Sequence, residues 1–448
     1  MVLLLLSASA PGQDLVVEPG GRQQYLKYDG LPNPYGSFPA TPGTSTWDTI
    51  TVKSRATLFV HGDEEITVRD TLTVELGGEV IFVPKTRELT PEEIDIYAIP
   101  GKGTTFGRVS GRIIAENVLI EAGGAIHSNG QGYMGDRGWD GAGLWHPGGS
   151  HGGLGFYTRD PERVPPTYGS VTEPTAVGLG GGWNDHMAYG GGAVRLIVNN
   201  TLTNNGRIGA NGGLLPDHKF PEGQIQWGLV GTFSHSAGGA GGSVWISTGV
   251  LEGNGLIEAN GDGTWREFAT GSGGGRVAVY YEDATDFDLV NNLRALPTLE
   301  GDNGRGQPQG GTVYLENTAN GERHLVVGGR IDLPEVGQSS AIYDSVTVLD
   351  TGLLQLGEGM ILTVNGAIHV QEAGQIVAQG HNNEEKVDGE WMGEGATIIA
   401  ESVTIDEGGA IHADGQGYFA NGISGYFYGG GPGGYLENGN HNVNNYAA

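Results

Sequence analysis

The sequence predicts an all-β fold, organised as a β-solenoid with long glycine-rich loops on one side. Three observations lead to this prediction. A block of eighteen residues occurs twice, short β-branched runs alternate with polar residues, and glycine supplies 84 of the 448 residues, roughly a fifth against a usual ~7 %. Repeated units that cannot bury an apolar face alone stack on their neighbours, and the stack then shares one interior.

The repeat relates residues 116–133, ENVLIEAGGAIHSNGQGY, to residues 401–418, ESVTIDEGGAIHADGQGY, with twelve of the eighteen positions identical. The similarity extends upstream, because residues 47–82 resemble residues 343–377. Self-similarity on this scale indicates that one supersecondary module begins near Trp47 and begins again near Tyr343.

These boundaries divide the chain into four parts. Residues 1–10 combine an apolar run with an Ala-Ser-Ala triplet, which we interpret as the remnant of a secretory signal. Residues 11–46 are a polar, proline-rich lead segment. A first module spans 47–342, and the start of a second, incomplete module spans 343–448. Since the second module stops before its next glycine-cluster strand, we expect a longer parent protein, a loosely placed tail after about Tyr426 and end-to-end stacking of exposed coils.

Within each module, strands are expected from residue 47 onward, because apolar residues recur at every second position. Strands then end in Asn-Gly or Asp-Gly turns, which suit a positive backbone φ. Glycine clusters at 190, 238, 271 and 310 begin the following strands. The long loops 129–190 and 211–238 lie between turn and cluster, and we expect them to project from one face, where binding surfaces often occur.

The turns also predict which side chains point inward. Four isoleucines stand just before equivalent turns, and we expect them to stack in the core: Ile126, Ile208, Ile257 and Ile411. His127 and His412 directly follow two of these isoleucines. Strict alternation therefore places both imidazoles on the outer face.

Charge and cysteine content exclude several classes of function. The formal net charge of −29 disfavours nucleic acid and anionic membrane surfaces, both of which attract clusters of Lys and Arg. The absence of cysteine excludes disulfides and thiolate metal sites. No segment approaches the ~20 apolar residues of a membrane-spanning helix.

Three motifs resemble a known family, the large glycine-rich, repeat-bearing surface and secreted proteins of bacteria, which are adhesin-like. They are the Ala-Asn-Gly or Ala-Asp-Gly turns, GSGGGRVAVYY at 271–281 and GGTVYLE at 310–316. The resemblance covers about residues 47–434. It implies a right-handed parallel β-helix, a secreted or cell-surface location, and a structural or adhesive role. The partner that we expect, from the aromatic-rich loops, is an extracellular polysaccharide or surface. The resemblance supplies no catalytic residues.

The first long loop holds the candidate binding residues. Imidazole and carboxylate side chains are metal ligands where thiolates are absent; the candidates are Asp136, Asp140, His146, His151, Asp185 and His186. The alternative is that these side chains are structural or solvated. Acidic, glycine-rich turns also suit Ca²⁺, although plain turn formation explains the same residues.

Four aromatic residues in this loop are candidate sugar-binding platforms, namely Trp139, Trp145, Trp183 and Tyr189. Packing of the loop onto the coil beneath is the other interpretation. A polysaccharide-active β-helix enzyme, a lyase or glycoside hydrolase, is the alternative function, because Asp136, Arg137 and Asp140 share one loop. Such an enzyme needs several acids and a base that converge in one groove, and no catalytic residue is assigned.

Overall fold

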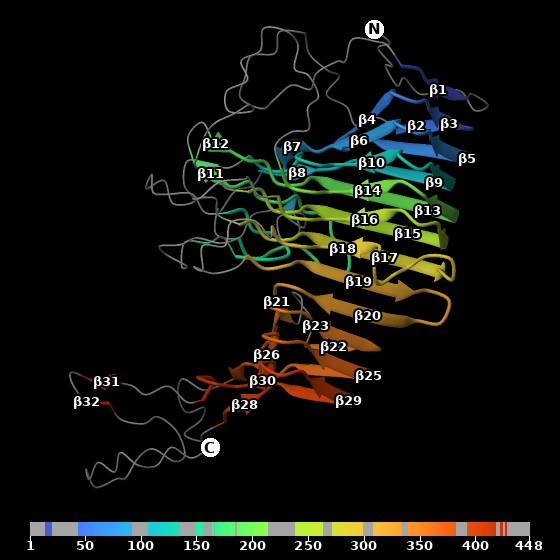
Figure 1. Ribbon diagram of the computed structural model, residues 1–448. Coiled ribbons are helices and arrows are strands. Elements are labelled where there is room, and N and C mark those ends of the chain that lie inside the picture. The colour runs from blue at the N-terminus through green and yellow to red at the C-terminus, as the bar shows by residue number, and fades with distance from the viewer. Residues whose placement is uncertain are drawn as a thin grey trace. The chain divides into compact units, whose positions relative to one another are not determined.

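The computed structural model shows an all-β protein with mostly parallel sheets (Figure 1). It describes residues 14–19, 44–91, 106–134, 148–155, 164, 166–183, 186–213, 238–262, 271–298, 308–333, 339–381, 392–417, 422–423 and 426–427. The chain forms two compact units, residues 1–330 and residues 331–448.

In the first unit, two parallel sheets run the length of the strand array. The first sheet has the order β1 (Leu15–Val17), β3 (Ile50–Val52), β5 (Glu65–Val74), β9 (Arg112–Ile120), β13 (Ala193–Asn204), β15 (Ser243–Glu252), β17 (Arg276–Asp283), β19 (Thr312–Asn317) and β20 (Glu322–Val327). The second has the order β4 (Thr57–His61), β6 (Glu79–Val83), β10 (Ala125–His127), β14 (Arg207–Gly209), β16 (Leu256–Glu258) and β18 (Leu293–Arg294).

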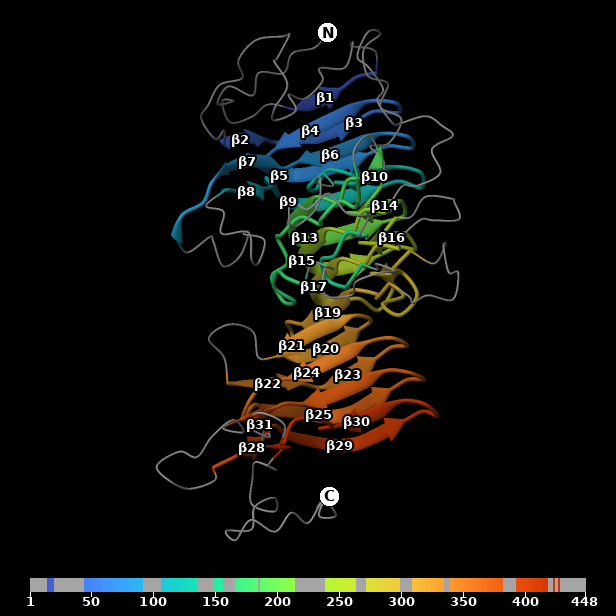
Figure 2. The same cartoon turned by 90° about the vertical axis from the view of Figure 1, so that its left-hand side faces the viewer.

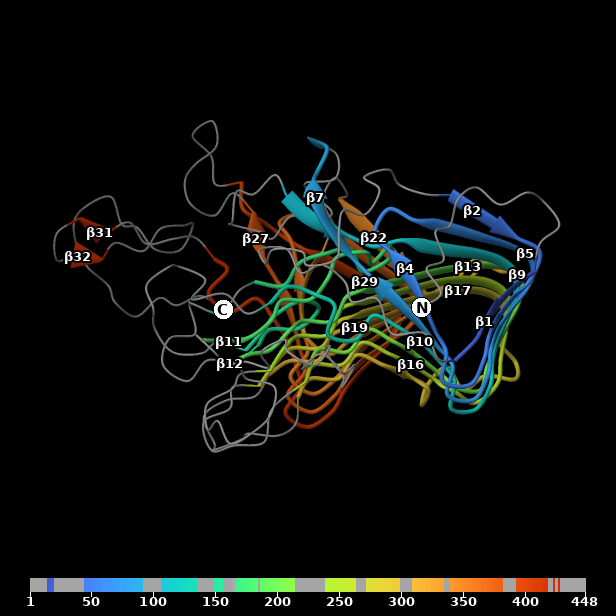
Figure 3. The ribbon, with the colours of Figure 1, turned by 90° about the horizontal axis from the view of Figure 1, so that it is seen from above.

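The chain alternates between these two sheets from β3 to β19. Each new strand pairs in parallel with the previous strand of its own sheet, so successive strands stack in chain order (Figure 2). Strands β9, β13 and β17 overlie one another in the view from above (Figure 3). Two short antiparallel pairs interrupt the alternation, β7 (Lys85–Glu88) with β8 (Phe106–Val109) and β11 (Gly182–Trp183) with β12 (His186–Met187). The last pair of the first sheet, β19 with β20, is also antiparallel.

A β-bulge divides the longer strands of the first sheet. In β5 the register shifts between Val68 and Thr71, and the two residues between them are exposed. The half of β5 before the bulge pairs with β2 (Thr44–Trp47), and the half after it pairs with β3. Because a bulge bends a strand, the two halves of β5 differ in direction and pair with two different neighbouring strands.

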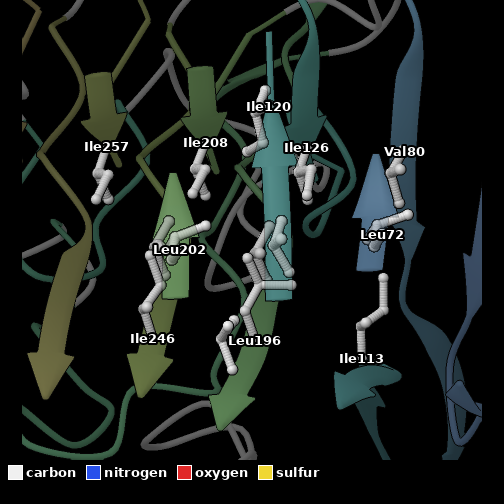
Figure 4. Packing of buried hydrophobic residues seen from close by; sticks show 14 of the residues in the cluster. Leu72, Val80, Ile113, Ile120, Ile126, Leu196, Leu202, Ile208, Ile246 and Ile257 are labelled. Atoms are coloured by element: carbon white, nitrogen blue, oxygen red, sulfur yellow. The ribbon is translucent and has the colours of Figure 1, made fainter. Parts of the chain in front are cut away.

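The core lies between the two sheets and consists of stacked apolar rows. Val80, Ile126, Ile208 and Ile257 are register partners on neighbouring strands, and all four are completely buried. Figure 4 shows them in one row. Burial of each side chain contributes roughly 1.5 to 3 kcal/mol of transfer free energy. The predicted isoleucine ladder is therefore confirmed for Ile126, Ile208 and Ile257.

The predicted outer location of His127 is wrong. Its side chain alternates with Ile126, yet it is only 5 % exposed, and its register partners Ile81 and Gly209 are buried as well. The glycine cluster that begins at residue 190 lies against this strand and explains the burial. The amide of Gly192 donates to the carbonyl of Ser128, the residue after His127, at 2.7 Å. Parallel sheets are commonly covered on both faces, so alternation identified the side of the strand but not its exposure.

The second unit uses the same order of elements. Its first sheet has β25 (Ile361–Val370) between β29 (Thr397–Ile405) and two shorter strands, β22 (Ser340–Tyr343) and β23 (Ser345–Val348). Its other sheet has the order β21 (Arg330–Leu333), β24 (Leu353–Leu356), β26 (Gln375–Ala378) and β30 (Ala410–His412). Four further short strands form two antiparallel pairs: β27 (Gly380–His381) with β28 (Glu394–Gly395), and β31 (Gly422–Ile423) with β32 (Tyr426–Phe427).

Ile411 of β30 pairs with Ile376 of β26 but is only partly buried, and His412 is also partly buried. The predicted tail after Tyr426 lies outside the described residues except for Phe427. Among the described residues, none belongs to a helix of the length and apolarity that crossing a membrane requires.

Candidate functional site

The described part of the first long loop lies against the sheets of the first unit as a separate layer. We call residues 148–155 and 166–181 the cover. Residues 148–153 are buried, whereas the sequence led us to expect a loop that projects from one face, with packing onto the strands beneath as the other interpretation of its aromatic residues. The sheet amides and carbonyls at the glycine clusters explain the difference, because they hydrogen-bond the cover instead of water.

Backbone hydrogen bonds join the cover to the glycine clusters that begin at residues 238 and 271. Gly149 donates to the carbonyl of Gly238 at 3.1 Å, and Gly153 donates to that of Gly274 at 2.9 Å. In the other direction, Ala240 donates to Leu179 at 2.9 Å. Glycine is required for this approach, since a Cβ on Gly153 would overlap the carbonyl oxygen of Gly310. The glycine-rich composition therefore builds a close-packed backbone layer here.

Side chains of the first sheet fix the cover from below. Ala193, Ser243, Arg276 and Thr312 form one register row across four strands, and all four are buried. The Ser243 hydroxyl donates to the carbonyl of Ala176 at 2.5 Å. Arg276 Nε donates to the carbonyl of Tyr168 at 2.9 Å. The cover thus crosses the beginnings of these strands.

His151 is the one predicted metal ligand whose side chain the structure describes, and it is completely buried in the cover. Its Nδ1 lies 3.0 Å from the carbonyl oxygen of Gly241, an arrangement that requires the proton on Nδ1. Nε2 is buried and has no hydrogen-bond partner among the described residues. Burial, together with the nearby Arg276 cation, lowers the pKa of His151 to about 3. This imidazole is neutral at ordinary pH and is held as a packing group.

Tyr168 packs its ring against the imidazole, with ring centres 4.8 Å apart. Its hydroxyl donates to the carbonyl of Val177 at 2.5 Å, and burial raises its pKa. Leu179 and Ala176 complete this small apolar cluster, and Tyr133 packs against it. The cluster gives the cover a core of its own.

Arg276 is the important residue that the sequence did not single out. Its Nη1 donates to the Thr312 hydroxyl at 3.2 Å while the side chain is 3 % exposed. A signal was present, because Arg276 follows a glycine cluster at the position occupied by small residues elsewhere, Ala193, Ser243 and Thr312. A long, positively charged side chain in a row of otherwise small side chains indicates a specific contact above the sheet.

The other predicted residues fall into two groups. Tyr189 is partly buried; its hydroxyl donates to Met134 Sδ at 3.2 Å, and burial raises its pKa. Trp183 of β11 and His186 of β12 are register partners in an antiparallel strand pair. The remaining candidates lie outside the described residues: Asp136, Trp139, Asp140, Trp145, His146 and Asp185.

The repeated turns of the second sheet form an asparagine ladder. The side-chain oxygen of Asn129 accepts from the amide of Asn211 at 2.7 Å, and that of Asn211 accepts from the amide of Asn260 at 2.7 Å. Asn260 in turn accepts from the amide of Leu296 at 2.8 Å. Glu258, 5 % exposed, accepts from the amide groups of Asn211 and Asn260. The ladder aligns four consecutive turns of the chain.

The acidic residues of the described ranges are dispersed. Asp63 pairs with Arg87 at 2.9 Å, Glu65 pairs with Arg112, and Glu258 pairs with Arg207 at 3.3 Å. The residues that the structure describes hold no group of three or more histidine or acidic side chains placed to bind a metal ion. Comparisons with protein-family models, with curated proteins and with solved structures find no match for this chain.

Proposed function

We propose that this chain is a right-handed parallel β-solenoid segment of a secreted or cell-surface protein, with a structural or adhesive role. The observation that carries the proposal is the regular alternation of the chain between two parallel sheets, in which each strand advances the stack by one position. Connections between parallel strands are right-handed in nearly all proteins. Such a scaffold grows by adding coils, and it presents its loops along one side.

Two further features support an extracellular scaffold. The hydrogen bonds of the asparagine ladder and of the cover stabilise the fold in addition to the apolar core. They stand in place of disulfides, because the chain has no cysteine. The net charge of −29 keeps such a surface highly solvated.

The adhesive part of the proposal is that aromatic side chains of the long loop bind an extracellular polysaccharide. The test is a glycan array on the whole chain, with and without Ca²⁺. We expect binding that the double substitution Trp139→Ala with Trp145→Ala reduces by at least tenfold. The matched control is Trp245→Ala, because Trp245 lies on β15 against Arg195, 4.0 Å from its ring centre and outside both loops.

The array also separates the alternatives. Calcium-dependent binding supports a calcium site in the acidic turns, and equal binding in chelator contradicts one. Release of unsaturated or reducing-end products from a bound polysaccharide favours the lyase or glycoside hydrolase. Absence of binding to any glycan contradicts the adhesive role and leaves the structural one.

A further inference from the structure

The cover contacts the first sheet through the imidazole of His151, whose surroundings disfavour its protonation. The His151 imidazole is completely buried and uses Nδ1 for the Gly241 carbonyl. A proton added at Nε2 would have no acceptor among the described residues. The charged group that faces the ring is the buried Arg276 guanidinium of β17, and the ring packed on it is Tyr168, beside Tyr133. A second cation at this place is disfavoured both by desolvation and by repulsion.

When the cover is detached, the same imidazole is in water, where its ordinary pKa is 6.5. Acid therefore stabilises the detached form alone. The closed form retains its full advantage above the ordinary pKa and loses it progressively as the pH falls from 6.5 toward about 3. One proton taken up per opening raises the opening constant about tenfold for each pH unit in this window.

We propose that the cover is an acid-labile clasp, which detaches from the row formed by Ser243, Arg276 and Thr312 in acidic surroundings, with His151 as the group that takes up the proton. The sheet beneath does not depend on this contact, because its strands are held by their own ladders and by the apolar core. Opening is thus local, as expected for a layer joined largely by backbone hydrogen bonds.

Detachment uncovers an aromatic surface on the outer face of the first sheet. Tyr280 of β17 donates its hydroxyl to the carbonyl of Thr172 in the cover at 2.9 Å, and its ring lies 5.6 Å from that of Tyr314. Tyr314 is 2 % exposed in the closed form. Aromatic side chains of this kind dominate interface energetics once they are accessible, so acid would present a contact surface that neutral pH hides.

The test is hydrogen exchange with mass spectrometry on the full chain between pH 7.5 and pH 4.5, corrected for the intrinsic pH dependence of exchange. We expect the opening constant of residues 148–155 and 166–179 to rise by roughly 30- to 100-fold between pH 6.5 and pH 4.5. Strands β13 and β15 should keep their protection. The substitution His151→Gln, whose amide can still donate to Gly241 but cannot titrate, should remove most of this rise.

Two variants separate the proton from simple loss of packing. Tyr168→Phe deletes the hydroxyl bond to Val177 and should raise opening at every pH while leaving the pH slope intact. His412→Gln changes a partly exposed histidine of the second unit and should leave the profile of the cover unchanged.

An equal pH slope in wild type and in His151→Gln overturns the proposal. If His151→Gln fails to fold, ¹⁵N spectra of the wild-type imidazoles decide instead. A His151 signal that titrates near 6.5 while the cover stays protected also overturns it, whereas a signal that stays neutral in the protected form supports it.

Discussion

Strands β9 and β29 occupy equivalent places in the two units and share six of nine residues, RIIAENVLI and TIIAESVTI. Their surroundings differ. Val118 and Ile120 of β9 are at most 1 % exposed, whereas the equivalent Val403 and Ile405 of β29 are 47 % and 46 % exposed. In the first unit β9 lies between β5 and β13. In the second, β29 pairs with β25, and the described residues include no strand on its other edge.

Burial of a strand's side chains in these sheets therefore depends on the neighbouring strands at both of its edges. The same alternation of Ile and Val forms a complete core row when strands flank it on both sides, and a half-exposed row where the described residues supply a strand on one side only. The pairing itself is preserved, since the preceding partner of each strand carries a bulge at the same place, between Val68 and Thr71 of β5 and between Val364 and Ala367 of β25. Local sequence sets strand and register, while stacking sets the free energy gained by burial.

The largest test of this comparison is a matched pair of truncations, Ile120→Ala in β9 and Ile405→Ala in β29. Removal of the completely buried Ile120 should lower the free energy of unfolding of the first unit by about 2 to 5 kcal/mol, because it leaves a cavity between sheets. The half-exposed Ile405 should cost under about 1 kcal/mol. Urea denaturation of each variant, with hydrogen exchange to assign the affected unit, measures both. Equal losses would contradict the dependence of burial on the next strand.

These positions also show how much the sequence could predict. Period-two alternation and the repeated turns were sufficient to place Ile126, Ile208 and Ile257 in one row, because both signals are local. The burial of His127 and of the cover depends on a layer contributed by residues distant in the chain, and no local pattern reports it. His151 was chosen as a metal ligand for its residue type, whereas its neighbours make it a neutral packing group.

The second test concerns glycine in the two units. Gly153→Ala should destabilise the cover by roughly 1 to 3 kcal/mol, because the added methyl group overlaps the Gly310 carbonyl oxygen in a layer that cannot move apart without losing hydrogen bonds. Gly395→Ala is the matched control, since a Cβ there meets nothing within 4 Å, and it should be neutral. Hydrogen exchange of residues 148–155 reports the loss. If Gly153→Ala keeps full protection, the cover is looser than its hydrogen bonds indicate.

The smallest expected effect is that of an aspartate substitution in the asparagine ladder. The second unit already carries an aspartate, Asp414, at the position that Asn129 occupies in the first unit. Asn129 contributes its side-chain oxygen to the Asn211 amide, a role that aspartate can fill, so Asn129→Asp should change stability by less than about 0.5 kcal/mol.

Asn211 also donates Nδ2 to the buried Glu258 carboxylate at 2.8 Å. Asn211→Asp removes that donor and sets two carboxylates side by side, which should cost roughly 1 to 2 kcal/mol at neutral pH. Since like charges raise the pKa of one member of such a pair, the loss should shrink as the pH falls and that carboxyl group takes up a proton. Thermal unfolding of both variants at pH 7 and pH 5 measures the difference. An equal cost for the two substitutions, or no recovery at pH 5, would show that the ladder acts through backbone geometry alone and that Glu258 contributes nothing specific to it.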